Sequence, residues 1–216
     1  MDIQKLQEIY TKHPGVKALA TNLETQKTIQ LAGLQGSSAS LVFAALKSLN
    51  KRDYPFLFIL DDEEEAGYFY NDLTQILGQE QVLFFPCSYK RAIKYGQRDA
   101  GNEILRTEVL TKLSTPPSRE LAGGLYIVTY PQALAELVIT KKQLNDQTLS
   151  LQKGEQVDII FVQETLIAFG FKRVDYVYEP GQFAVRGSII DVYSYSCEYP
   201  YRIDFFGDEV DSIRTF

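Results

Sequence analysis

A run of five apolar residues, Phe-Leu-Phe-Ile-Leu at positions 56–60, constrains the fold of this chain more than any other stretch. A half-buried strand alternates apolar and polar residues, whereas a continuous apolar run is typical of a strand buried in a parallel sheet. Asp61 and Asp62 follow and can cap a helix, whose apolar residues keep helical spacing until Gly78. The run therefore predicts a buried parallel strand followed by a helix, as in α/β folds.

Strands and helices alternate in this way over the first part of the chain. We expect further strands at residues 28–34, 82–85 and 125–128, and helices at 40–49, 104–113 and 131–138. Residues 6–10 close a short opening helix that stops at Pro14 and Gly15. After about Thr140 the chain becomes polar, and then a helix at 162–169 and a strand-rich stretch with turn signals follow. The sequence thus predicts two domains: a parallel α/β domain over residues 1–140, and a smaller α+β domain with antiparallel strands over residues 141–216.

Composition excludes several classes of protein. With 216 residues, of which 45% are hydrophobic, the chain can bury a real core. Its net charge of −6 argues against a general nucleic-acid-binding surface, which needs a basic face. No apolar run approaches the ~20 residues of a membrane span. Two distant cysteines, Cys87 and Cys197, and a single histidine, His13, offer no zinc site. We expect a reduced, cytoplasmic protein that binds no membrane and no metal.

Residues 33–40 match the frame of a nucleotide-binding P-loop without its essential residues. Such a loop reads G-x-x-x-x-G-K-[ST]. Counted from Gly33, the second glycine falls on Ser38, the lysine on Ala39 and the hydroxyl on Ser40. Alanine cannot reach a phosphate, and Ser38 restricts the backbone where a phosphate must approach. Both interpretations, a degenerate nucleotide site and an ordinary turn before a helix, predict no catalytic residues, no bound cofactor and no ATPase activity.

Two charged segments have competing interpretations. The acidic run 61–65 resembles a magnesium-binding box, but carboxylates at a helix N-terminus are favoured by the helix dipole, so we interpret it as a helix start. The segment between Phe85 and Asn102 combines positive charge with Tyr89 and Tyr95, which suits a nucleic-acid backbone as well as a solvated loop. The sequence leaves this second choice open.

The sequence Tyr-Arg-Ile-Asp-Phe-Phe at positions 201–206 predicts an unusual outward face. Strict alternation places Ile203 and Phe205 on the core face and turns Arg202 and Phe206 the other way. We expect Arg186, on the preceding strand, to lie close to them. Arginine and aromatic residues are enriched at the centres of protein interfaces. Phe206 is therefore expected to be covered, either by a partner or by a loop of the same chain.

The same stretch carries a long, specific family pattern. Residues 182–192 read x-F-x-V-R-G-x-x-[IV]-[DE]-[VI], and residues 202–210 read R-[IV]-[DE]-F-F-G-D-E-[IV]. They resemble the segment shared by the excision-repair protein UvrB and the UvrB-like N-terminal module of bacterial transcription-repair coupling factors (Mfd). The resemblance extends more weakly over nearly the whole chain. It implies a helicase-like (RecA-like) domain with a degenerate P-loop, followed by an inserted domain that binds UvrA.

Two departures separate the members of this family. UvrB has an intact Walker A loop, and it has a long damage-probing hairpin for which residues 86–102 are too short. Both differences favour the coupling-factor branch, with a UvrB-like, ATP-dependent DNA-damage-binding subunit as the alternative. The resemblance implies a fragment of a longer protein that recruits UvrA through Arg186, Arg202 and Phe206. RNA polymerase and DNA would be bound only by other domains of the full-length protein.

Overall fold

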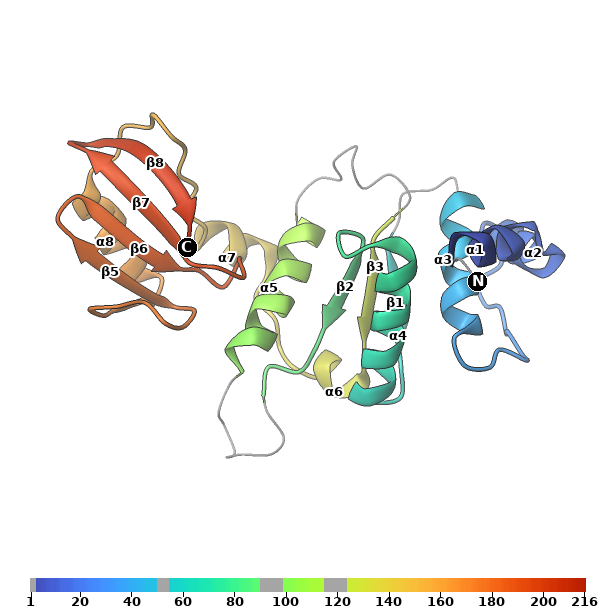
Figure 1. Ribbon diagram of the computed structural model, residues 1–216. Helices are drawn as coiled ribbons and strands as arrows, with labels where there is room; N and C mark the ends of the chain where they lie inside the picture. Colours follow the sequence, from blue (N-terminus) through green and yellow to red (C-terminus); the bar gives the residue numbers. More distant parts are fainter. Residues whose placement is uncertain (1–2, 50–54, 90–98, 115–123) are drawn as a thin grey trace. The chain divides into compact units, whose positions relative to one another are not determined.

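The structure is a computed structural model that describes residues 3–49, 55–89, 99–114 and 124–216. The chain divides into two compact units, Met1–Cys87 with Thr115–Glu136, and Ser88–Ser114 with Leu137–Phe216. Each unit contains one sheet, three-stranded and parallel in the first and five-stranded and mostly antiparallel in the second (Figure 1). The predicted mixture of an α/β part and an α+β part is confirmed at this level. Within the described ranges, no helix combines the length and the apolar character that a bilayer-spanning segment needs.

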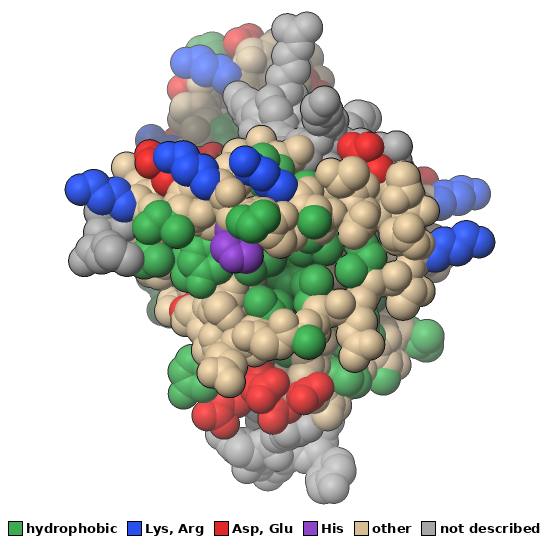
Figure 2. Space-filling model, turned by 90° about the vertical axis from the view of Figure 1, so that its right-hand side faces the viewer, with side chains coloured by type: hydrophobic (Ala, Val, Ile, Leu, Met, Phe, Trp, Pro, Cys, Tyr) green, Lys and Arg blue, Asp and Glu red, His purple; other side chains and the backbone are tan. Residues whose placement is uncertain are grey.

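Three helices at the start of the chain share a small core: α1 (Ile3–Lys12), α2 (Pro14–Asn22) and α3 (Ser38–Leu49). Val16 and Leu19 of α2 pack in one cluster with Leu46 of α3. Figure 2 shows hydrophobic side chains gathered around the single histidine on this face of the molecule. That histidine, His13, caps α2 because its ring nitrogen accepts a hydrogen bond from the Gly15 amide at 3.1 Å.

The prediction of a strand at residues 28–34 is wrong. This segment has no strand conformation, and most of its residues are exposed. Ile29 packs beside the cluster formed by the first helices. Of the apolar residues that suggested a strand, Ile29 therefore joins a helical core while Leu31 and Leu34 are exposed, and the segment before α3 is an irregular loop.

The first sheet contains β1 (Phe56–Ile59), β2 (Val82–Phe85) and β3 (Tyr126–Thr129) in the order β1-β3-β2. Helix α4 (Glu63–Leu77) follows β1. The Asp62 carboxylate accepts a hydrogen bond from the Glu65 amide at 2.9 Å, and Gly78 ends the helix with φ of 90°. The acidic run is therefore a helix start, as predicted.

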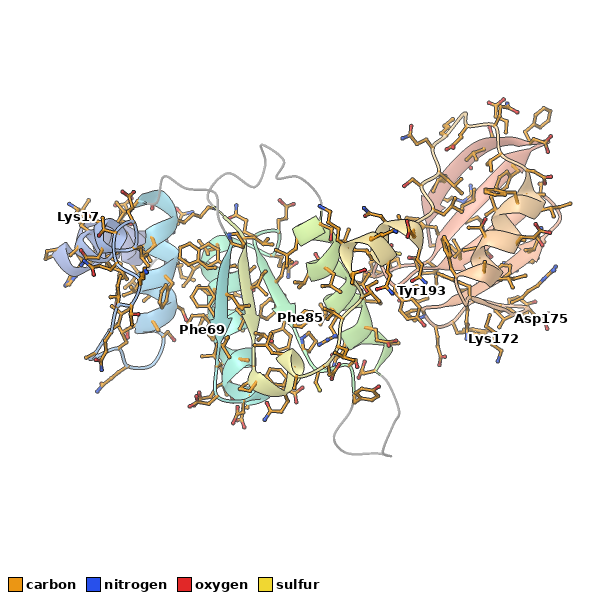
Figure 3. All side chains as sticks on the ribbon, turned by 180° about the vertical axis from the view of Figure 1, so that it is seen from behind. Lys17, Phe69, Phe85, Lys172, Asp175 and Tyr193 are labelled. Carbon is orange, nitrogen blue, oxygen red and sulfur yellow. The ribbon has the colours of Figure 1, made fainter. Side chains whose placement is uncertain are left out.

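The prediction that the run at 56–60 forms a buried strand is wrong. Strand β1 lies at an edge of this sheet, and β3 occupies its centre with every residue buried. Phe58 packs against Phe69 of α4, which Figure 3 labels, with ring centroids 5.1 Å apart. Leu57 and Ile59, which alternate with Phe58 along the strand, are exposed. Among the described residues, no strand pairs with the outer side of β1, so only one face of the apolar run is covered.

Helix α6 (Pro131–Leu134) begins at its proline as predicted but ends four residues early, and residues 137–139 after it are exposed.

The second unit contains α5 (Ala100–Ser114), α7 (Lys141–Asp146), α8 (Ile159–Ala168) and the strands β4 (Lys172–Arg173), β5 (Gln182–Arg186), β6 (Ile189–Tyr193), β7 (Tyr201–Phe206) and β8 (Glu209–Thr215). The strands are ordered β4-β5-β6-β7-β8, and only β4 and β5 are parallel. Figure 3 labels Lys172 and Asp175, which lie in and just after the edge strand β4.

One face of this sheet packs against α8. Val162 and Leu166 of the helix join Phe183, Ile203 and Phe205 of the strands in a single buried cluster. Helix α8 begins where the Asp158 carboxylate accepts a hydrogen bond from the Ile160 amide at 2.7 Å. The second unit therefore has an inner face, covered by α8, and an outer face that points away from it.

Two hairpins fix which residues reach the outer face. Gly187 and Gly207 begin two-residue turns with φ of 62° each, and no other residue type in the described chain has a positive φ. A glycine with positive φ at the first turn position is typical of a type II′ hairpin, whose twist matches that of the strands. The residue before each turn is Arg186 in one hairpin and Phe206 in the other. These turns set the strand register at both predicted residues.

Candidate protein-interaction site

The outer face of the five-stranded sheet brings the predicted residues together. On β7, Ile203 and Phe205 are buried on the inner face, while Arg202 and Phe206 point outward. The predicted alternation of this strand is therefore confirmed. The outer face includes Arg186 on β5, Asp191 and Tyr193 on β6, Arg202, Asp204 and Phe206 on β7, and Glu209 and Arg214 on β8.

Asp191 lies beneath two arginines at the centre of this face. It sits directly opposite Arg202 in the β6–β7 pairing and diagonally from Arg186 across the β5–β6 pairing. Arg202 donates two hydrogen bonds to the carboxylate, Nε to Oδ1 at 2.6 Å and Nη2 to Oδ2 at 2.8 Å. Arg186 Nη2 also donates to Oδ2. We call Arg186 and Arg202 the arginine pair.

Burial and charge act in opposite directions on Asp191, whose side chain is only 2% exposed. Burial alone would raise the pKa of this carboxyl, but hydrogen bonds from Arg202 and then Arg186 hold its pKa below the ordinary value. The hydrogen bond to Asp191 also raises the pKa of Arg202. Asp191 is therefore ionised at neutral pH, with both of its oxygens occupied by guanidinium groups.

Aromatic rings support both guanidinium groups. The guanidinium carbon of Arg202 lies 4.6 Å from the ring centroid of Phe216, and that of Arg186 lies 5.4 Å from the centroid of Tyr176. These distances fall in the range of cation–π contacts. Each member of the arginine pair thus contacts one ring and shares one carboxylate.

A second ion pair lies next to the first. Asp204 accepts from Arg214 Nη2 at 3.1 Å and from the Ser212 hydroxyl at 3.0 Å. Its side chain is less exposed than that of Arg214. In both groups the carboxylate lies below and the arginine above, so this face presents hydrogen-bond donors to the solvent.

Phe206 stands uncovered at one end of this face. It is 84% exposed, whereas its neighbour Phe205 is only 5% exposed. The Phe205 amide donates to the Ser188 carbonyl at 2.9 Å, which places Phe206 beside the turn that follows Arg186. The sequence allowed this ring to be covered either by a partner or by a loop of the same chain. Within the described residues, no loop covers it.

The placement of Arg186 requires a correction. It lies on the predicted face but on β5, two strands away from β7, because β6 runs between them. Sequence reasoning gave no role to Asp191, Tyr176 and Phe216. The alternation Ile190-Asp191-Val192 was a usable signal for an outward carboxylate, but its partners depend on strand pairing that the sequence does not specify.

Two serines of the P-loop frame make hydrogen bonds within the protein. The Ser38 hydroxyl accepts a hydrogen bond from the Gln35 amide at 2.7 Å, within the loop itself. Ser40 is buried and its hydroxyl points to Asp72 Oδ2 at 3.4 Å. Gly33 has φ of 81°, and Ala39 brings no polar group. Among the residues that the structure describes, no three His, Cys, Asp or Glu side chains are grouped to hold a metal.

The basic segment between Phe85 and Asn102 cannot be placed as a surface. Residues 90–98, including Tyr95, lie outside the described residues. Nucleic-acid contact by this segment stays a hypothesis, as it was from the sequence.

Comparison with known proteins gives a family for the segment that contains the five-stranded sheet. Residues 149–216 match the UvrB interaction domain family. The transcription-repair-coupling factor of Bacillus subtilis is 28% identical over 216 residues, covering 99% of this chain and 18% of that protein. The corresponding protein of Haemophilus influenzae is 37% identical over 172 residues, covering 80% of this chain and 14% of that protein.

UvrB proteins are similar to this chain as well. The UvrABC system protein B of Streptococcus equi subsp. zooepidemicus is 25% identical over 211 residues, covering 93% of this chain and 31% of that protein. The chain therefore spans less than a fifth of the two coupling factors and about a third of this UvrB. The predicted resemblance to the family of coupling factors and UvrB is confirmed.

Proposed function

Since this chain is a relative of the transcription-repair-coupling factors and of UvrB, we propose that it recruits UvrA in transcription-coupled excision repair. The binding surface is the outer face of the β5–β8 sheet, and Arg186, Arg202 and Phe206 make the contacts. The observation that carries this proposal is an 84% exposed phenylalanine on the same sheet face as two ordered arginines, inside the segment that matches the UvrB interaction domain. RNA polymerase and DNA are engaged by other parts of the longer protein.

The chemistry of this face suits an acidic partner surface. Its three arginines, Arg186, Arg202 and Arg214, lie above Asp191 and Asp204, so their remaining donors point outward, while Glu209 lies directly opposite Phe206. Arginine donors form charge-assisted bonds to carboxylates, often in bidentate geometry. A partner that also covers Phe206 gains roughly 1.5–3 kcal/mol from burying the ring. The proposed UvrA surface therefore combines carboxylates with an apolar pocket.

The proposal assigns the residues before about 140 to a helicase-like, RecA-like domain without ATPase activity, and residues 141–216 to UvrA binding. The inward-turned Ser40 hydroxyl and the bond within the loop at Ser38 support this division of roles. A P-loop serine must face the metal of the bound nucleotide, and its lysine must reach the phosphates. Ala39 supplies neither group.

A matched pair of phenylalanines tests UvrA recruitment. Phe206 lies on the outer face, and Phe161 is a half-exposed phenylalanine on α8, which covers the inner face. By calorimetry with purified UvrA, Phe206→Ala should weaken binding by about 2 kcal/mol or more, as at an interface hot spot. Phe161→Ala should leave affinity unchanged. Equal loss in both variants, or no binding by the unaltered chain, contradicts the proposed surface.

Nucleotide binding is tested separately. Millimolar Mg-ATP should leave the melting temperature of the chain unchanged, because a ligand well above its Kd must stabilise the folded state. A rise that depends on the γ-phosphate, together with retention of lesion-bearing DNA in a gel-shift assay, would instead favour the UvrB-like alternative.

A further inference from the structure

We propose that Asp191 is a positioning residue for partner binding: it holds Arg186 and Arg202 in the orientation that the partner recognises, without contacting the partner itself. This inference rests on the proposed function, because it concerns how the same face binds its partner. One carboxylate on β6 bonds two arginines, one on β5 and one on β7, whereas a surface ion pair involves a single arginine.

Burial excludes a direct contact between Asp191 and a partner. Its side chain is 2% exposed, whereas those of Arg186 and Arg202 are 46% and 28% exposed. Both carboxylate oxygens already accept hydrogen bonds from the arginine pair. Any effect of Asp191 on binding must therefore pass through the two guanidinium groups above it.

The geometry of these bonds leaves donors available for the partner. Arg202 uses Nε and Nη2 on one edge of its guanidinium group, and Arg186 uses Nη2. A guanidinium group has five N–H donors in a fixed plane. The remaining donors of each group keep a defined direction, since the shared carboxylate and an aromatic ring, Phe216 or Tyr176, restrict its rotation.

Fixing the arginines before binding strengthens association. A long, flexible side chain loses rotamer freedom when a partner immobilises it, and that loss subtracts from affinity. Here the ordering takes place on folding. Two arginines that are already ordered need less ordering by the partner, so freeing them should weaken binding by about tenfold, equivalent to about 1.4 kcal/mol.

The experiment compares Asp191→Asn with Asp204→Asn in binding to purified UvrA. Both changes remove one negative charge from the outer face, but Asp204 is held by Arg214 and Ser212 rather than by the arginine pair. We expect Asp191→Asn to weaken binding about tenfold and Asp204→Asn to change it less than threefold. Asp191→Glu should retain affinity within about threefold, because it restores a charged acceptor.

The possible outcomes distinguish failure of the proposed function from failure of the positioning role of Asp191. No binding by the unaltered chain refutes the proposed function. Binding that is lost in Phe206→Ala but unchanged or tighter in Asp191→Asn refutes only the positioning role, and tighter binding would mean that Asp191 masks the arginines. Equal weakening by Asp191→Asn and Asp204→Asn would assign the effect to net charge and also overturn the inference.

A measurement on the unaltered chain covers the case in which Asp191→Asn does not fold. Side-chain nitrogen NMR reports how fast each arginine Nε–H exchanges with water. Because Arg202 Nε donates to Asp191, its proton should exchange at least tenfold more slowly than that of Arg214, whose Nη2 contacts Asp204. Equal exchange rates would show that the carboxylate does not hold Arg202 in solution, and the positioning role would fail.

Discussion

Two adjacent phenylalanines on β7 should respond in opposite ways to the same substitution. Phe205 is 5% exposed and belongs to the cluster against α8, while Phe206 is 84% exposed. Truncating a buried phenylalanine removes its transfer free energy and leaves a cavity, which costs about 3–5 kcal/mol. A ring worth roughly 1.5–3 kcal/mol when fully buried contributes only ~0.2–0.5 kcal/mol at the exposure of Phe206.

Urea unfolding followed by far-ultraviolet circular dichroism measures both variants, since the chain has no tryptophan to report by fluorescence. Phe205→Ala should lower the free energy of unfolding of the second unit by about 3 kcal/mol or more, with a fall in Tm of about 12 °C or more for a unit of this size. Phe206→Ala should stay within about 0.5 kcal/mol of the original chain. A loss above about 2 kcal/mol in Phe206→Ala, or below about 1 kcal/mol in Phe205→Ala, would refute the alternation.

Two further predictions concern backbone conformation and pH. Gly207→Ala should destabilise the chain by about 1–2 kcal/mol, because φ is 62° at this position. Gly67→Ala, inside α4 with open space around the new Cβ, should stabilise the chain by about 0.5–1 kcal/mol. Calorimetric melting measures both variants, and a change of the same sign in both would contradict the turn assignment. The pKa of Asp191 is lowered in the folded chain, so its contribution to folding is complete above the ordinary carboxyl pKa of about 3.9 and is lost as pH falls through the folded value. The stability difference between the original chain and Asp191→Asn should therefore be constant from about pH 8 to about pH 5 and shrink below about pH 4; a difference that already falls near neutral pH would count against an ionised Asp191.

Local signals in the sequence were sufficient for several elements. Asp62 and Gly78 bound α4 as their capping chemistry predicts, because a cap depends on residues within one turn of the helix. The alternation of β7 was equally local, since the side-chain period of a strand needs no knowledge of its neighbours. Alternation alone therefore predicts that Arg202 and Phe206 point outward.

Features that depend on strand order were not predictable in this way. Residues 56–60 read as a buried strand, yet β1 became an edge strand because β3, from a distant part of the chain, took the central position. Asp191 was missed for the same reason. Its two partners come from β5 and β7, and only the pairing of three strands reveals that one carboxylate serves both.

Strand register is the property through which this face depends on its fold. A slip of one residue between β6 and β7 would bury Arg202 and Phe206 and expose Ile203 and Phe205, because side chains alternate with a period of two. Several independent features oppose that slip: the glycine turns at 187 and 207, the buried inner residues, and the Arg202–Asp191 bonds between directly opposed positions. Buried ion pairs are weak contributors to net stability but can specify one arrangement over another. On the proposal that Arg186 and Arg202 face the partner, a charged Asp191 at the centre of the sheet specifies their arrangement even where an apolar residue would stabilise the fold equally well.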